Sequence, residues 1–87
     1  MNYKAEIKKS LERLAYYECL SAQKQEAWDA DPMNSDREAA ADQAYELEFN
    51  EYIFAAHLIS RFAGIGEKEA RAMISKDRAK LTRILSV

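Results

Sequence analysis

Residues that interrupt helices occur at only two places in this sequence of 87 residues. Pro32 is the only proline, and the residue before a proline is pushed away from helical geometry. Gly64 and Gly66 are the only glycines, and a glycine inside a helix costs about 0.5–1 kcal/mol relative to alanine. The sequence therefore predicts two long uninterrupted segments, with a shorter one after the glycines.

Both long segments have the apolar periodicity of amphipathic helices. In the first, from Tyr3 to about Ala27, the apolar residues at spacings of three and four are Ile7, Leu11, Leu14, Tyr17 and Leu20. The second has a wider stripe, formed by Ala40, Ala44, Leu47, Phe54 and Leu58, with Tyr45, Phe49, Tyr52, Ile53 and Ile59 beside them. No segment alternates between apolar and polar residues as a strand does.

The turn at Pro32 is short, and a short connection favours antiparallel neighbours. Ser35 and Glu38 follow it with the spacing of a capping box, in which both side chains accept hydrogen bonds from free N–H groups at a helix start. We therefore expect one all-α domain over residues 1–87. It should contain a long antiparallel helical hairpin (about 3–28 and 36–62), then two short helices (about 67–74 and 78–85), the last with Leu81, Ile84 and Leu85 facing inward.

Composition argues against several classes of protein. No run approaches the roughly 18 apolar residues of a membrane span, and the first residues lack the apolar core of a signal peptide. We therefore expect a cytoplasmic protein without membrane contact. Cys19 is the only cysteine, which excludes an intrachain disulfide and a cysteine–histidine zinc site, and we expect a buried, reduced thiol.

Nothing in the sequence marks a catalytic centre. His57 is the only histidine, and Phe54 stands where the Glu-x-x-His spacing of di-iron bundles needs a carboxylate. We expect His57 in the core or at its boundary. Because no nucleophile–base pair, phosphate loop or redox motif is present, we expect a protein that is not an enzyme and uses neither cofactor nor metal.

A two-helix hairpin of this length has no third long helix to cover its apolar stripe. Tyr45, Phe49 and Tyr52 would then be partly bare. We expect these residues to form a protein interface, either in a homodimer that joins two hairpins into a four-helix arrangement or with a different partner protein.

The net charge of −2 conceals a segregation of charge along the chain. From Glu26 to Glu51 there are nine acidic residues and one basic, whereas from Leu58 to Val87 there are seven basic and three acidic. An antiparallel hairpin would gather eleven of the thirteen basic side chains at one end. Such an end attracts polyanions even though the net charge of the protein is negative. The alternative is that these charges are only solvated helix faces, with acidic residues near helix starts and basic residues near helix ends to match the helix dipoles.

The segment of residues 58–74 resembles the helix-hairpin-helix motif of DNA-binding and DNA-repair proteins. The resemblance rests on Phe62, the Gly64-Ile65-Gly66 hairpin, Ala70 four residues after the second glycine, and the apolar Met73 and Ile74. In that family the helix after the hairpin points its first N–H groups at a DNA phosphate, often beside a monovalent cation bound by hairpin carbonyls. The resemblance covers 17 of the 87 residues.

The resemblance implies a phosphate site on the backbone of Gly64, Ile65 and Gly66, with the side chains of Lys68 and Arg71 as further contacts. Arg61 and Lys76 are the remaining candidates for nucleic-acid binding. Free N–H groups at a helix start do form an anion site, and glycine lets a phosphate approach. The alternative is a purely structural turn, in which Gly64 ends the helix in a left-handed cap and Ala70 lets two helices approach closely.

The sequence thus predicts a non-enzymatic protein whose basic end binds the backbone of nucleic acid. If the ligand is DNA, we expect its contacts to be independent of base sequence. The alternative is a protein-binding helical module, such as a phage-type inhibitor or accessory factor, that acts through the aromatic or acidic face of residues 36–62. In its short length and compact helical pattern the chain resembles accessory proteins of phages and mobile elements, including anti-CRISPR inhibitors. This resemblance rests on no shared motif.

Overall fold

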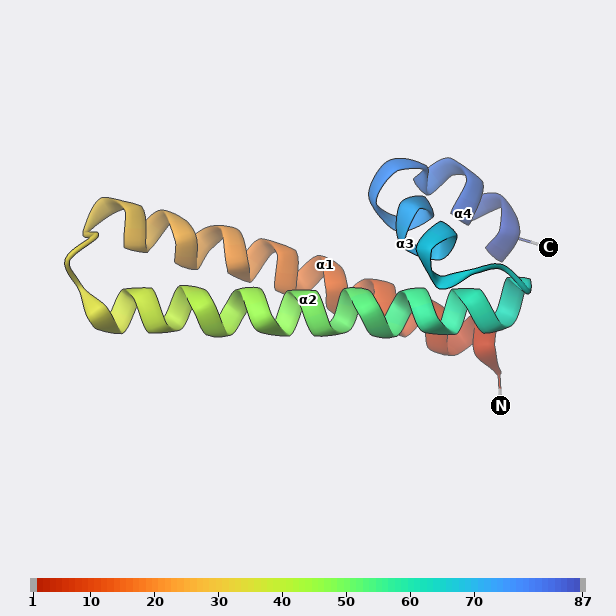
Figure 1. Cartoon of the computed structure of the whole chain (residues 1–87), viewed down its shortest axis with the longest axis horizontal. Helices are drawn as coiled ribbons and strands as arrows, with labels where there is room; N and C mark the ends of the chain where they lie inside the picture. Colours follow the sequence, from red (N-terminus) through yellow and green to blue (C-terminus); the bar gives the residue numbers. More distant parts are fainter. Residues whose placement is uncertain (1, 87) are drawn as a thin grey trace.

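The computed structural model describes residues 2–86, which form four α-helices. Their bounds are α1 Tyr3–Ala30, α2 Ser35–Ala63, α3 Glu67–Lys76 and α4 Arg78–Leu85. Helices α1 and α2 form a long antiparallel hairpin, and α3 and α4 lie together at the end where α1 begins and α2 ends (Figure 1). The molecule measures 48 × 24 × 19 Å. The predicted all-α fold, a long hairpin followed by two short helices, is confirmed.

None of the helices within residues 2–86 is long and apolar enough to cross a membrane.

Asparagine and aspartate side chains cap three of the four helices. Asn2 caps α1, Asp77 caps α4, and Asn34 Oδ1 accepts from two N–H groups in the first turn of α2, at 3.0 and 3.2 Å. The predicted capping box of Ser35 and Glu38 is therefore wrong, because the residue before Ser35 already supplies the cap. As a result, α2 begins at Ser35, one residue earlier than expected.

The core occupies only the half of the molecule that contains α3 and α4. All four helices contribute to this cluster of buried residues: Ile7, Leu14, Ala55, Ala56, Leu58, Ile59, Ala70, Met73, Ile74, Leu81 and Leu85. Alanines at positions 55, 56 and 70 leave room for α3 to lie close to α2. Leu81 and Leu85 face inward, as the spacing of apolar residues in α4 predicts.

The other half of the hairpin is a two-helix arm with very little core. We call residues 17–46 the distal arm, and residues 2–16 with 47–86 the proximal half. Within the distal arm only Ala41 and Ala44 are buried. Leu47 and Phe54, which the sequence places on the apolar stripe of α2, are also exposed, Leu47 next to the arm and Phe54 within the proximal half. The hairpin therefore depends on the proximal half for most of its packing.

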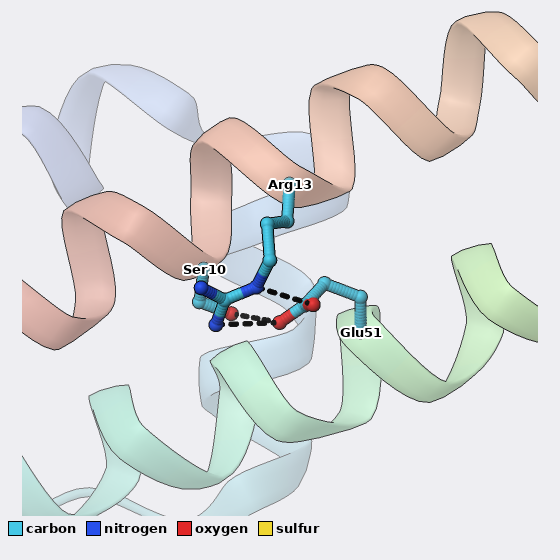
Figure 2. A network of polar contacts seen from close by, with 3 residues as sticks. All are labelled: Ser10, Arg13 and Glu51. Carbon is cyan, nitrogen blue, oxygen red and sulfur yellow. Dashed lines mark hydrogen bonds and ion pairs between the residues drawn. The ribbon is translucent and has the colours of Figure 1, made fainter.

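A polar cluster around one buried hydroxyl fixes how α1 lies against α2. Figure 2 shows Ser10 and Arg13 of α1 pointing toward Glu51 of α2. Ser10 is fully buried, and its Oγ donates to Glu51 Oε2 at 2.6 Å. Arg13 Nε donates to Glu51 Oε1 at 2.8 Å, and this hydrogen bond is the main reason that the pKa of Arg13 is raised. One carboxylate thus joins two turns of α1 and sets the register of the hairpin.

We predict that Glu51→Ala lowers the free energy of unfolding by about 2 kcal/mol, because it leaves the buried Ser10 hydroxyl without an acceptor. Urea unfolding followed by circular dichroism measures the change. The control is Glu46→Ala, which removes an exposed carboxylate from the same helix and should change stability by less than about 0.5 kcal/mol. Equal losses in the two variants would show that the cluster does not fix the hairpin.

Candidate nucleic-acid interface

Three residues connect α2 to α3, and Ser60 holds them in place. Gly64 has a φ of +69°, in the left-handed region that favours glycine, and its N–H donates to Ser60 O at 3.0 Å. The N–H of Ile65 donates to the same oxygen at 3.2 Å, and the Ser60 hydroxyl donates back to Ile65 O. The left-handed cap at Gly64 is therefore confirmed, and Ser60 is a positioning residue that the sequence reasoning missed.

Helix α3 begins with an uncapped first turn. Gly66 occupies its N-cap position, and no side chain there accepts from the first N–H groups. A methyl group added at Gly66 would find no heavy atom within 4 Å, so the space beside these groups is open. Ile65 packs against the core and offers only its backbone. The start of α3 therefore presents free donors and the positive end of a helix dipole.

The predicted basic side chains do not all lie at this turn. The positive charges of Arg61, near the end of α2, and Arg71, one turn after Glu67 on α3, contribute to the lowered pKa of Glu67. Lys68 is exposed within that turn. Lys76 is the last residue of α3, about 12 Å along the helix axis from Lys68. Lys76 is therefore too far from the start of α3 to share a phosphate with Lys68.

His57 and Glu67 form a contact across the turn that the sequence did not reveal. His57 Nδ1 lies 2.7 Å from Glu67 Oε1, and both side chains are about half exposed. The expectation that His57 is a core or boundary residue is therefore wrong. The hydrogen bond to His57 is the main reason that the pKa of Glu67 is lowered, with smaller contributions from Arg71 and Arg61. It holds the carboxylate toward α2, and Glu67 does not cap α3.

Charge differs strongly between the two ends of the molecule. The proximal half contains eleven basic and seven acidic residues, a net charge of +4, and the distal arm contains two basic and eight acidic residues, a net charge of −6. Some proximal cations are already paired within the chain, as in Arg78–Glu18 at 3.6 Å and Lys80–Glu69 at 3.8 Å. The segregation along the sequence becomes a separation in space, because the hairpin is antiparallel.

The predicted protein-interface residues line a cleft on the side of the hairpin where α3 ends and α4 begins. This cleft has a volume of about 360 Å³, with Tyr45, Phe49 and Tyr52 on one wall and Ile74 on another. Tyr45 and Phe49 stack with their ring centres 6.4 Å apart, and they are 61% and 48% exposed. The Tyr52 hydroxyl donates to Arg71 O at 3.0 Å, so Tyr52 is half-buried and belongs to the fold.

Other reactive side chains do not assemble into a second site in the part of the chain that the structure describes. No group of three histidine, cysteine, aspartate or glutamate residues among residues 2–86 is arranged to hold a metal ion. Cys19 is exposed on α1, so the expectation of a buried thiol is wrong. The stripe of α1 at spacings of three and four turns Leu14 inward, and Cys19 falls outside that stripe.

No protein-family model matches this chain, and no match was found among curated proteins or solved structures. Its function is therefore inferred from the chemistry of its own residues.

The two glycines should respond differently to substitution by alanine. Gly64→Ala places a side chain in the left-handed region and should lower the free energy of unfolding by about 1 kcal/mol. Gly66→Ala meets no neighbouring atom at an ordinary φ of −69°, and the gain from a less flexible unfolded chain is offset because alanine is a poorer N-cap residue than glycine, so stability should change by less than about 0.5 kcal/mol. Urea unfolding of both variants measures the difference. A loss at Gly66 as large as that at Gly64 would contradict the geometry of the loop.

The contact between His57 and Glu67 predicts a dependence of stability on pH. The pKa of Glu67 is lower in the folded protein than its ordinary value of 4.5. The ionised carboxylate therefore contributes fully to stability at a pH above 4.5, and this contribution is lost as the pH falls through the lower pKa of the folded state. Carboxyl chemical shifts followed by NMR should give a pKa for Glu67 below 4.5, and His57→Ala should move it upward. An identical titration in both proteins would mean that the contact does not persist in solution.

Proposed function

We propose that the proximal half binds the phosphate backbone of nucleic acid without reading base sequence. The observation that carries the proposal is the open, uncapped first turn of α3, with Lys68 exposed in that turn and Arg71 exposed on the next one. The resemblance of residues 58–74 to the helix-hairpin-helix motif supports the same site and the same ligand.

The chemistry of this turn suits a phosphate group. The first N–H groups of α3 are donors without helical partners, and the helix dipole adds a positive potential at the same place. Gly66 has no side chain to keep a phosphate away from these donors. The Glu67 carboxylate is hydrogen-bonded to His57 and does not cap α3, so the first N–H groups of the helix remain free donors. Arg61 and Arg71 then contribute charge-assisted hydrogen bonds to the phosphate oxygens.

The charge of the proximal half extends the attraction beyond the turn. Its net charge of +4 draws a polyanion toward this end, and the arm of net charge −6 repels the polyanion from the other end. Contacts of this kind are made to phosphates, which are the same at every base pair. We therefore infer binding that is independent of base sequence and sensitive to salt.

We predict that the protein binds fluorescent duplexes of two unrelated sequences with equal affinity, and that the affinity falls steeply between about 50 mM and 200 mM salt. Replacing both Lys68 and Arg71 by alanine should weaken binding and reduce the slope of log affinity against log salt by about two, because two phosphate contacts are lost. Fluorescence anisotropy measures both quantities. The matched control is Lys24→Ala, an exposed lysine of the distal arm that should change neither.

Gly66→Asp separates binding from stability. An aspartate at this N-cap position accepts hydrogen bonds from the free N–H groups of α3, so it should preserve stability or raise it by a few tenths of a kcal/mol. The same carboxylate occupies the phosphate position and should reduce binding strongly. Undiminished binding by Gly66→Asp, or no binding to DNA at low salt, would exclude the turn as the site.

The second candidate function is that of a protein-binding module. The exposed stack of Tyr45 and Phe49, at the point where the acidic arm meets the proximal half, favours it. An acidic surface with aromatic residues can imitate nucleic acid for a protein that has a basic binding groove. A phage-type inhibitor or accessory factor would use such a surface. Affinity purification that captures a partner with the wild-type chain, but not with both aromatics replaced by serine, distinguishes this function from DNA binding.

A further inference from the structure

One face of α2 is covered along half of its length and bare along the other half. Residues at spacings of three and four form a single stripe along this face: Glu38, Asp42, Tyr45, Phe49, Tyr52, Ala56 and Ile59. At the C-terminal end of the stripe, Ala56 and Ile59 are buried in the core that α3 and α4 complete. Tyr45 and Phe49 continue the same stripe but are exposed. The surface that α3 and α4 cover thus extends, uncovered, onto the distal arm.

The bare part of this stripe has a distinctive chemistry. Its two exposed aromatic rings are followed by the exposed carboxylates of Asp42 and Glu38, and Glu18 and Glu48 line the adjoining cleft. The arm as a whole has a net charge of −6 and buries only two alanines of its own. A partner that fits here presents basic side chains together with a short helical surface.

The proximal half of the same molecule has that surface. Lys76 and Arg83 are exposed on α3 and α4, and the proximal half has a net charge of +4. The arm portion of α1 is about 21 Å long, close to half of the 48 Å length of the molecule. As Figure 1 shows, α3 and α4 stand beside only one end of the hairpin, which gives the molecule a stepped outline. When two such molecules lie antiparallel, the α3 and α4 of each one can fill the space beside the distal arm of the other.

From this geometry we propose that two copies of the chain pair antiparallel, so that α3 and α4 of each copy cover the distal arm of the other. Each acidic arm then faces the basic proximal half of its partner, and the exposed stack of Tyr45 and Phe49 is covered. The two contacts are identical and the assembly closes at two copies, as in a two-fold symmetric dimer. This pairing uses different residues from the nucleic-acid contact proposed at Gly66 and does not depend on it.

Light scattering coupled to size-exclusion chromatography tests the pairing with a charge swap. The wild-type chain should have twice the mass of 10.0 kDa that one chain has. An arm variant (Glu38→Lys with Asp42→Lys) and a body variant (Lys76→Glu with Arg83→Glu) change only exposed residues, and each alone should elute as a monomer. An equimolar mixture of the two should recover the dimer mass, because both contacts of the mixed dimer again join opposite charges.

Further outcomes distinguish this arrangement from its rivals. Lys8→Glu with Lys9→Glu makes the same charge change as the body variant on the exposed side of α1, and it should remain a dimer. Circular dichroism establishes that each variant is folded. A monomeric wild-type chain at high micromolar concentration would overturn the proposal. A body variant that remains a dimer on its own would also overturn it, because that result is expected if the two arms pair with each other. A mixture of the two variants that stays monomeric would overturn it as well.

Binding to DNA is measured separately, so the two proposals can fail independently. The arm variant retains Gly66, Lys68 and Arg71, and as a monomer it should still bind a duplex in the anisotropy experiment. Loss of dimerisation together with retained DNA binding would place the two functions on separate surfaces. A wild-type dimer that ignores DNA at low salt would overturn the nucleic-acid proposal and leave the pairing in place.

Discussion

The register of the hairpin depends on one carboxylate. Glu51 accepts hydrogen bonds from Ser10 and Arg13 on successive turns of α1, in the only place where a fully buried hydroxyl lies between the long helices of the described chain. A buried hydroxyl needs its acceptor, so α1 cannot slide along α2 without losing these bonds. This register brings the basic beginning of α1 level with the end of α2, where the core of all four helices forms.

The separation of charge gives the two ends of the hairpin different chemistry. The proximal half combines a complete core with a three-residue turn and an uncapped helix start, and these features suit a small anion held by backbone N–H groups. The distal arm has almost no core, and the stacked rings of Tyr45 and Phe49 lie where it meets the proximal half, beside Glu18 and Glu48. Because opposite charges lie at opposite ends, the net positive charge of the proximal half complements both a polyanion and the acidic arm of a second copy, as proposed above.

Much of the fold follows from local patterns in the sequence. The spacing of Ile7 and Leu14, the single proline and the pair of glycines together predict two long helices, a turn and a compact C-terminal end. Each of these signals depends on neighbours within about one helical turn, which a single sequence displays directly. The left-handed conformation of Gly64 is predicted for the same reason, since a glycine between two helical patterns is a common C-cap.

The remaining features depend on contacts that sequence spacing does not encode. Asn34 and Ser35 are adjacent and both suit an N-cap, so only the backbone decides which of them caps α2. His57 and Glu67 lie ten residues apart across a turn, a separation without a fixed geometry. The exposure of Leu47 and Phe54 follows from where α3 and α4 come to lie, which is a tertiary property. The site was therefore predictable as a turn and a set of cations, but not in its internal hydrogen bonding.

The scarcity of core in the distal arm implies a gradient of local opening along the hairpin. The free energy of the local opening that exposes an amide hydrogen to exchange depends on the contacts that the opening breaks. The arm has few such contacts, because it buries only Ala41 and Ala44. Its amides should therefore exchange long before those of the four-helix core, without global unfolding. Any molecule that covers the arm adds contacts that oppose this local opening, so association at this end should slow the exchange of the arm's amides.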